Sequence, residues 1–160
     1  MNKIQTFRRT LIPSSSKIQV DVWDSVVELH EQGKHSESIL RFFDYIDKDL
    51  KNKHRNADKT EFNVPHGSVV VNISINNGNF NVNVPFLKLP EKSAIPILRK
   101  VNEINFSPLT LSTIVLEGDE LRFKFSSPVD LTDPWKIYNV LREICINADN
   151  YDDEFIQKFH

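Results

Sequence analysis

Hydrophobic residues recur along this chain with two different spacings, and the change from one to the other falls near residue 69. Between residues 17 and 50 the apolar residues return every three or four positions, which is typical of helices with one buried face. Gly33 separates two such runs, so this segment predicts a hairpin of two helices. The apolar positions of the two runs are Val22, Trp23, Val26, Val27, Leu29, Ile39, Phe42, Phe43 and Ile46.

From residue 69 apolar and polar residues alternate, as in a strand that buries one face. Asn77-Gly78 supplies the left-handed pair of residues that a tight hairpin turn requires. The cross-strand pairs that this turn predicts are Ile75–Phe80, Ile73–Val82, Val71–Val84 and Val69–Phe86. All eight side chains then share one face, and the opposite face is rich in asparagine.

The rest of the chain predicts a helix, a second hairpin and a final helix. The first of these begins near Ser93, and its apolar stripe is Ala94, Ile97, Leu98, Val101 and Ile104. The second hairpin is predicted from Leu109 to Leu116 and from Leu121 to Phe125, with Gly118-Asp119 as the tight pair, Leu116 facing Leu121 and Ile114 facing Phe123.

The final helix has a clear start, because Thr132-Asp133-Pro134 offers a capping oxygen followed by proline at the first helical position. Its stripe is Ile137, Leu141, Ile144, Cys145 and Ala148. The pattern leaves open whether this helix continues through Tyr151 or breaks at Asn150.

These elements predict an α+β protein: an N-terminal helix hairpin, then an antiparallel sheet of two hairpins packed against two helices, in the order ββαββα. We divide the chain into a lead-in (1–16), the helical hairpin (17–50), a polar loop (51–66) and the α+β domain (67–160), and expect residues 17–50 to belong to the same globular unit. A length of 160 residues suits one domain.

Composition narrows the class of protein. The net charge of −2 and the mixing of both signs argue against nucleic acid as a partner. The one cluster of basic residues, in 51–59, fits a solvated loop better than an anion-binding patch. No apolar run reaches the roughly 20 residues of a membrane span, the basic N-terminus lacks the apolar segment of a secretory signal, and a single cysteine fits a reducing compartment. We therefore expect a cytoplasmic protein.

The residues that could carry chemistry do not form a recognisable site. His30-Glu31 followed by His35 departs from the i, i+4 spacing of a helical zinc motif, and Gly33 interrupts the helix. The carboxylates between Asp149 and Glu154 lack the glycine of a calcium loop. Cys145 falls on a buried stripe. We expect no catalytic residue, no metal and no cofactor.

Part of the chain resembles a known family. The residues that carry the resemblance are the helix ending in Asn102-Glu103-Ile104-Asn105, the hairpin Leu116–Leu121, and the long helix from Pro134 through Ala148-Asp149 to Tyr151-Asp152. This pattern, over about residues 67–160, resembles the YbjN-like group, which shares the fold of the type III secretion chaperones. The resemblance implies a bacterial α+β protein that dimerises and binds segments of other proteins, and it implies no catalytic residues.

The leading hypothesis is therefore a non-enzymatic, chaperone-like or adaptor-like module that binds another protein and forms a homodimer. Its candidate contact residues lie off or beyond the clean apolar stripes: Phe7, Ile12, Trp135, Tyr138, Phe155 and Phe159. The alternative for these six is that they seal the core. Two other functions stay open. One is an immunity or regulatory protein that masks a toxin or enzyme through acidic turns at 119–120 and 152–154, and the other is a small-molecule binder or enzyme with a pocket near His66 or Asn102.

Overall fold

The computed structural model describes residues 4–5, 17–46, 61–67 and 69–159. Its elements are β1 (Ile4–Gln5), α2 (Lys17–Glu31), α3 (His35–Ile46), β2 (Glu61–Gly67), β3 (Val69–Asn76), β4 (Asn79–Lys88), the 3₁₀ turn η1 (Glu91–Ser93), α5 (Ala94–Phe106), β5 (Thr113–Glu117), β6 (Glu120–Pro128), the 3₁₀ turn η2 (Val129–Leu131) and α6 (Pro134–Phe159). The predicted α+β class is confirmed.

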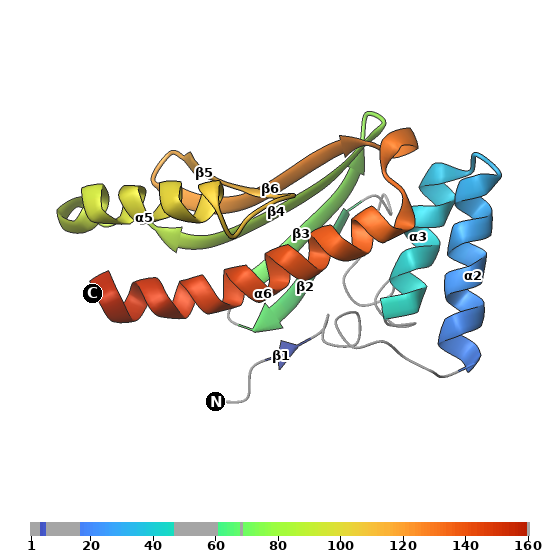
Figure 1. Ribbon diagram of the computed structural model, residues 1–160, viewed down its shortest axis with the longest axis horizontal. Helices are drawn as coiled ribbons and strands as arrows, with labels where there is room; N and C mark the ends of the chain where they lie inside the picture. The colour runs from blue at the N-terminus through green and yellow to red at the C-terminus, as the bar shows by residue number, and fades with distance from the viewer. Residues whose placement is uncertain (1–3, 6–16, 47–60, 68, 160) are drawn as a thin grey trace.

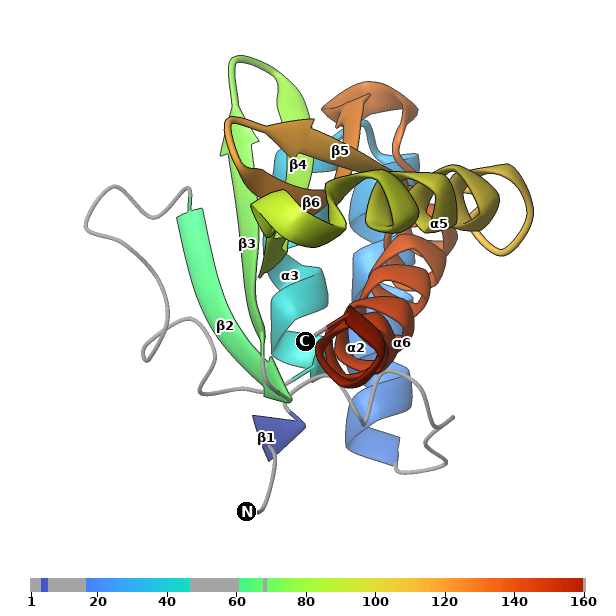
Figure 2. The ribbon, with the colours of Figure 1, turned by 90° about the vertical axis from the view of Figure 1, so that its left-hand side faces the viewer.

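The strands form one antiparallel sheet in the order β1-β2-β3-β4-β6-β5. Helix α6 runs along one face of this sheet, with α3 and α2 beyond its N-terminal end and α5 beside β5 (Figure 1). Seen from the side, the helices lie together on one side of β2, β3 and β4, and no described helix covers the other side (Figure 2). The sheet therefore has a core face and an open face.

The first hairpin forms around Asn77-Gly78, where both residues have positive φ angles of 51° and 77°. The predicted pairs Ile75–Phe80 and Ile73–Val82 are confirmed. The ladder between β3 and β4 ends at Asn72–Asn83, so the two further predicted pairs are wrong. Beyond that point Val71 pairs with Val64 of β2, and Val84 pairs with Phe123 of β6.

The second hairpin has the predicted pairs Leu116–Leu121 and Ile114–Phe123. Its first strand, however, starts at Thr113 and not at Leu109. Residues 110–112 are held out of the ladder because their backbone N–H groups donate to the Glu143 carboxylate of α6.

The prediction of a polar loop over 51–66 is wrong for its last six residues, which belong to β2. Phe62 and Val64 are fully buried and alternate with the exposed Asn63, so a period-two signal was present. Pro65 obscured it, since proline lacks the N–H that a central strand needs. Proline is tolerated here because β2 lies next to the sheet edge, and β1 pairs only with His66 and Gly67.

A single hydrophobic cluster joins the helical hairpin to the sheet. Val26 of α2 and Phe42 of α3 are fully buried in it, together with the inward residues of β2, β3, β4 and β6. The rings of Phe43 and Phe62 lie 4.4 Å apart between centroids. Helix α6 continues through Asn150 without a break, and its predicted stripe is buried.

Candidate protein-binding surface

An exposed apolar surface lies where α2 approaches the start of α6. Leu131 in η2 is 69% exposed and Trp135 in the first turn of α6 is 60% exposed. The indole of Trp135 contacts that of Trp23 on α2 edge-to-face, at 4.7 Å between centroids, and lies 6.2 Å from the ring of Tyr138. We call these four residues, Trp23, Leu131, Trp135 and Tyr138, the Trp135 patch. Both tryptophans of the chain belong to it.

The local sequence fixes the backbone under this patch. The Thr132 hydroxyl is buried and donates to the Pro128 carbonyl oxygen at 2.6 Å. Asp133 caps α6, since its Oδ1 accepts the backbone N–H of Lys136 at 3.0 Å. Pro134 then takes the first helical position, where its missing N–H has no intrahelical partner to lose. The predicted start of the helix is confirmed, and Trp135 is held outward on a rigid first turn.

The residues of this patch rest on the core without entering it fully. Trp23 is partly buried and lies 6.1 Å from the ring of the buried Phe42. Tyr138 is also partly buried and packs against the core. The patch is therefore an apolar surface with a rigid support, and its outermost side chains are Leu131 and Trp135.

Of the six contact residues predicted from sequence, the structure describes three side chains, those of Trp135, Tyr138 and Phe155. Phe7 and Ile12 lie outside the described residues, as does the side chain of Phe159. Phe155 is 1% exposed and lies 6.0 Å from the ring of Phe86 and 6.1 Å from that of Tyr151, so it belongs to the core. Among the described residues, the structure brings Trp135 and Tyr138 together. Sequence reasoning missed Trp23, which contacts Trp135, and the exposed Leu131, four positions before Trp135.

Other apolar side chains are exposed elsewhere among the described residues, and the largest exposed fraction is that of Phe106, at 92%. Phe106 is the last residue of α5. Its position, two residues after the last buried residue of the α5 stripe and just before Ser107-Pro108, is the sequence signal that could have identified it. Leu111 and Ile146 line one hollow together with polar side chains, and scattered apolar residues are common on soluble proteins.

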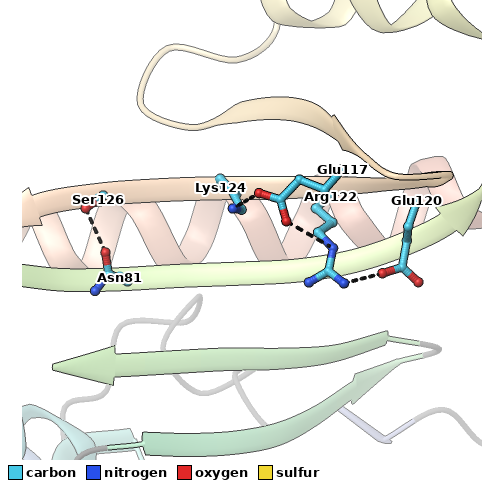
Figure 3. A network of polar contacts seen from close by, with 6 residues as sticks. All are labelled: Asn81, Glu117, Glu120, Arg122, Lys124 and Ser126. Atoms are coloured by element: carbon cyan, nitrogen blue, oxygen red, sulfur yellow. Dashed lines mark hydrogen bonds and ion pairs between the residues drawn. The ribbon is translucent and has the colours of Figure 1, made fainter. Parts of the chain in front are cut away.

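The open face of the sheet is polar and is organised in rows across the strands. One row is Asn63, Asn72, Asn83, Lys124 and Thr113, and the next is Glu61, Ser74, Asn81 and Ser126. The side chains bond to their cross-strand neighbours. The amide of Asn72 donates to Asn63 and Glu61 at 2.8 and 2.6 Å. The Ser126 hydroxyl donates to Asn81 at 2.7 Å (Figure 3).

Charges on this face are paired with each other. Glu117 contacts both Lys124 and Arg122, and Arg122 also lies 2.5 Å from Glu120 (Figure 3). The hydrogen bond from Lys124 is the main reason that the pKa of Glu117 lies below its usual range. The hollow over this face, ≈ 490 Å³, is lined mostly by amides and hydroxyls, together with Lys124 and the apolar residues Val82, Val115 and Phe125.

Two side chains protect the edge strand β5. Asn105, at the end of α5, donates to the Ile114 carbonyl oxygen at 2.9 Å and accepts the Ile114 N–H at 2.7 Å. Glu143 of α6 accepts the backbone N–H of Ser112 at 2.8 Å, the Ser112 hydroxyl at 2.7 Å and the Thr110 N–H at 2.7 Å. Unpaired backbone groups on an edge would otherwise be open to pairing with another strand.

These hydrogen bonds change the titration of Glu143. Burial raises its pKa, but the bonds donated by Thr110, Ser112 and Leu111 together outweigh burial, so the pKa of Glu143 is lowered from its ordinary value of 4.5. Carboxylates that accept several backbone N–H bonds are held in the charged form. Glu143 is thus a structural anion that fixes the segment before β5.

Cys145, His66 and Asn102, three other candidates for chemistry, do not form a shared site in the structure. Cys145 is fully buried in the core. His66 is buried on β2, whereas Asn102 is exposed on α5, so they do not share a pocket. Among the described residues no three His, Cys, Asp or Glu side chains gather as a metal site would need. In the same part of the chain, none of the helices combines the length and hydropathy of a membrane span.

Comparison with known proteins shows which solved structures have a similar fold. The chain matches no family model and no curated protein sequence. Among solved structures it is similar to YbjN from E. coli, a protein proposed to regulate transcription, with a TM-score of 0.51 and 13% identity over 74% of this chain and 91% of YbjN. The Yersinia pestis type III secretion chaperone SycH, solved in complex with a stable fragment of YscM2, gives a TM-score of 0.45 and 16% identity over 80% of this chain and 98% of SycH.

The fold is therefore an α+β fold with helices on one face of an antiparallel sheet, and within that class it is YbjN-like, as the sequence resemblance predicted. At 13% identity, the likeness to YbjN establishes the fold alone.

Proposed function

We propose that this protein is a non-enzymatic, chaperone-like or adaptor-like module that binds an apolar segment of another protein through the Trp135 patch. The observation that carries the proposal is that Leu131 and Trp135, four positions apart in the sequence, are both exposed, and that Trp135 packs on Trp23. Exposed apolar clusters with polar surroundings are typical of protein-binding sites.

Binding at the Trp135 patch is favourable when the free energy gained by burying apolar area exceeds the conformational entropy lost by the side chains. A partner that covers Leu131 and Trp135 removes apolar area from water at about 25 cal/mol per Å². Tryptophan is among the residues most often found at binding hot spots. Trp135 is already in contact with Trp23 and Tyr138, so little side-chain freedom remains to be lost on binding.

The alternative function, an immunity or regulatory protein that masks a toxin or enzyme through acidic turns, has less support at the tip of the second hairpin. Asp119 lies 3.3 Å from the Lys88 ammonium group, and Glu120 lies 2.5 Å from Arg122. These carboxylates are paired within the chain, so a basic partner would have to compete for them.

We extend the proposal to a homodimer in the cytoplasm that does not bind nucleic acid.

The test is capture from the cells that make the protein, with the wild type compared against the double variant Leu131→Ser, Trp135→Ser. The matched control is Phe106→Ser, because Phe106 is exposed on a different element. Proteins recovered by the wild type are identified by mass spectrometry, purified, and titrated while the fluorescence of the two tryptophans is followed.

A partner that binds the wild type and the Phe106→Ser control, fails to bind the double variant and shifts the tryptophan emission to shorter wavelength supports the proposal. A partner that binds the double variant with wild-type affinity places its site elsewhere and refutes the proposed surface.

A further inference from the structure

The turn between α2 and α3 brings two imidazoles together. His30 lies in the last turn of α2 and His35 is the first residue of α3. Their Nδ1 atoms are 3.2 Å apart, their ring centroids are 4.8 Å apart, and both side chains are partly buried. The sequence spacing of five residues does not fit one helix face, and it is the intervening turn that closes the distance.

The turn between His30 and His35 is held by the backbone angle of Gly33 and by two backbone hydrogen bonds. Gly33 adopts a φ of 78°, in the left-handed region that glycine tolerates. The N–H of Lys34 donates to the Leu29 carbonyl oxygen at 2.9 Å, and the N–H of Gly33 donates to the His30 carbonyl oxygen at 3.0 Å. These two bonds are those of a Schellman cap. They set the position of His35 relative to His30 independently of the rest of the molecule.

We propose that His30 and His35 chelate a late divalent transition-metal ion, such as Zn²⁺, through their two Nδ1 atoms. Imidazole nitrogens bind zinc at about 2.0–2.1 Å, so two of them at a tetrahedral metal lie about 3.3 Å apart. The observed 3.2 Å is a hydrogen-bond distance between the two rings, and it already holds both Nδ1 atoms within about 0.1 Å of the separation that a shared ion requires. Imidazole is a ligand that suits zinc, copper and nickel and is less suited to magnesium or calcium.

In the metal-free pair, one ring can donate its Nδ1 proton to the other ring. Chelation turns both Nδ1 lone pairs toward the ion, and the proton of the donor ring moves to Nε2, so the rings stay neutral. Among the described residues no third His, Cys, Asp or Glu completes a protein cluster. Water fills the remaining coordination positions, which makes this an accessible site of modest affinity.

The ion would also act on the fold, because it would link the end of one helix to the start of the next. The C-terminal end of a helix such as α2 carries a partial negative charge, which favours a nearby cation. A ligand that binds only the folded chain raises its stability. This site is separate from the Trp135 patch, so its test does not depend on the proposed function.

The experiment is calorimetric titration of the metal-free full chain with ZnCl₂, together with ¹H–¹⁵N NMR spectra at increasing Zn²⁺. The variants are His30→Asn and His35→Asn, and the matched control is His54→Asn. We expect one ion per chain, spectral changes confined to residues near 29–36, loss of binding in either of the first two variants and unchanged binding in the control.

The wild-type spectra localise the ion whether or not a variant folds. Spectral changes centred on other residues would overturn the proposal. Zinc binding that persists in folded His30→Asn or His35→Asn protein would do the same, as would the absence of any binding by the wild type.

Discussion

At the scale of single residues, Glu143 is the side chain whose charge the fold depends on most directly. It accepts hydrogen bonds from the backbone N–H groups of residues 110–112 and from two hydroxyls. Its pKa in the folded protein lies below the ordinary value of 4.5. The stabilisation is therefore fully present above that value and is lost as the pH falls through the lower folded-state pKa.

We predict that Glu143→Gln lowers the free energy of unfolding by about 1–2 kcal/mol at pH 7, because the glutamine keeps one acceptor oxygen but loses the charge. The measurement is urea unfolding of wild type and variant between pH 7 and pH 3. The difference between them should shrink toward pH 3. A difference that stays constant over this range would show that the charge of Glu143 does not contribute.

Phe155 and Trp135 test whether the aromatic residues of α6 seal the core or face a partner. Phe155 is 1% exposed and Trp135 is 60% exposed. We predict that Phe155→Ala costs about 3–5 kcal/mol of unfolding free energy, since it removes a buried ring. Trp135→Ala should change it by less than about 1 kcal/mol. Thermal unfolding of the two variants checks this, and equal losses would contradict the assignment of Trp135 to an open surface.

At the scale of elements, a side chain of α5 occupies backbone groups on the open edge of strand β5. The two hydrogen bonds between Asn105 and Ile114 occupy both backbone groups of that residue. We predict that Asn105→Ala lowers the unfolding free energy by about 1–2 kcal/mol and increases aggregation, because the open edge can pair with another chain. Urea unfolding and light scattering at raised protein concentration measure the two effects.

The control for this prediction is Asn102→Ala, since Asn102 lies exposed on the same helix. Its stability and its tendency to aggregate should equal those of the wild type. Were both variants to aggregate equally, the effect would belong to α5 as a whole and not to the closure of the edge.

At the scale of the whole molecule, the proposed homodimer predicts a particle of twice the chain mass of 18.6 kDa. Light scattering coupled to size-exclusion chromatography measures this mass, and dilution should shift it toward the monomer if the dimer is reversible. If the double variant Leu131→Ser, Trp135→Ser is monomeric while the wild type is a dimer, the Trp135 patch is occupied by the second copy. A monomer at all concentrations would exclude the homodimer.

The sequence by itself determined the elements whose signals are local. A hairpin follows from Asn77-Gly78 because few residues other than asparagine and glycine tolerate positive φ. The start of α6 follows from Asp133-Pro134, whose capping bond needs only neighbouring atoms. The resemblance over residues 67–160 likewise indicated the YbjN-like fold that the structure has.

Only the tertiary structure decided the features that join distant segments. It added β2 to the sheet, because Phe62 is buried against Phe43 of α3. It brought Trp23 under Trp135, more than one hundred positions later in the chain, and placed Phe155 in the core. Periodicity could not separate the buried from the exposed side chains of α6, because the apolar residues of this helix occupy more than one stripe. Which stripe is covered depends on the neighbours that packing supplies, and a local pattern contains no information about those neighbours.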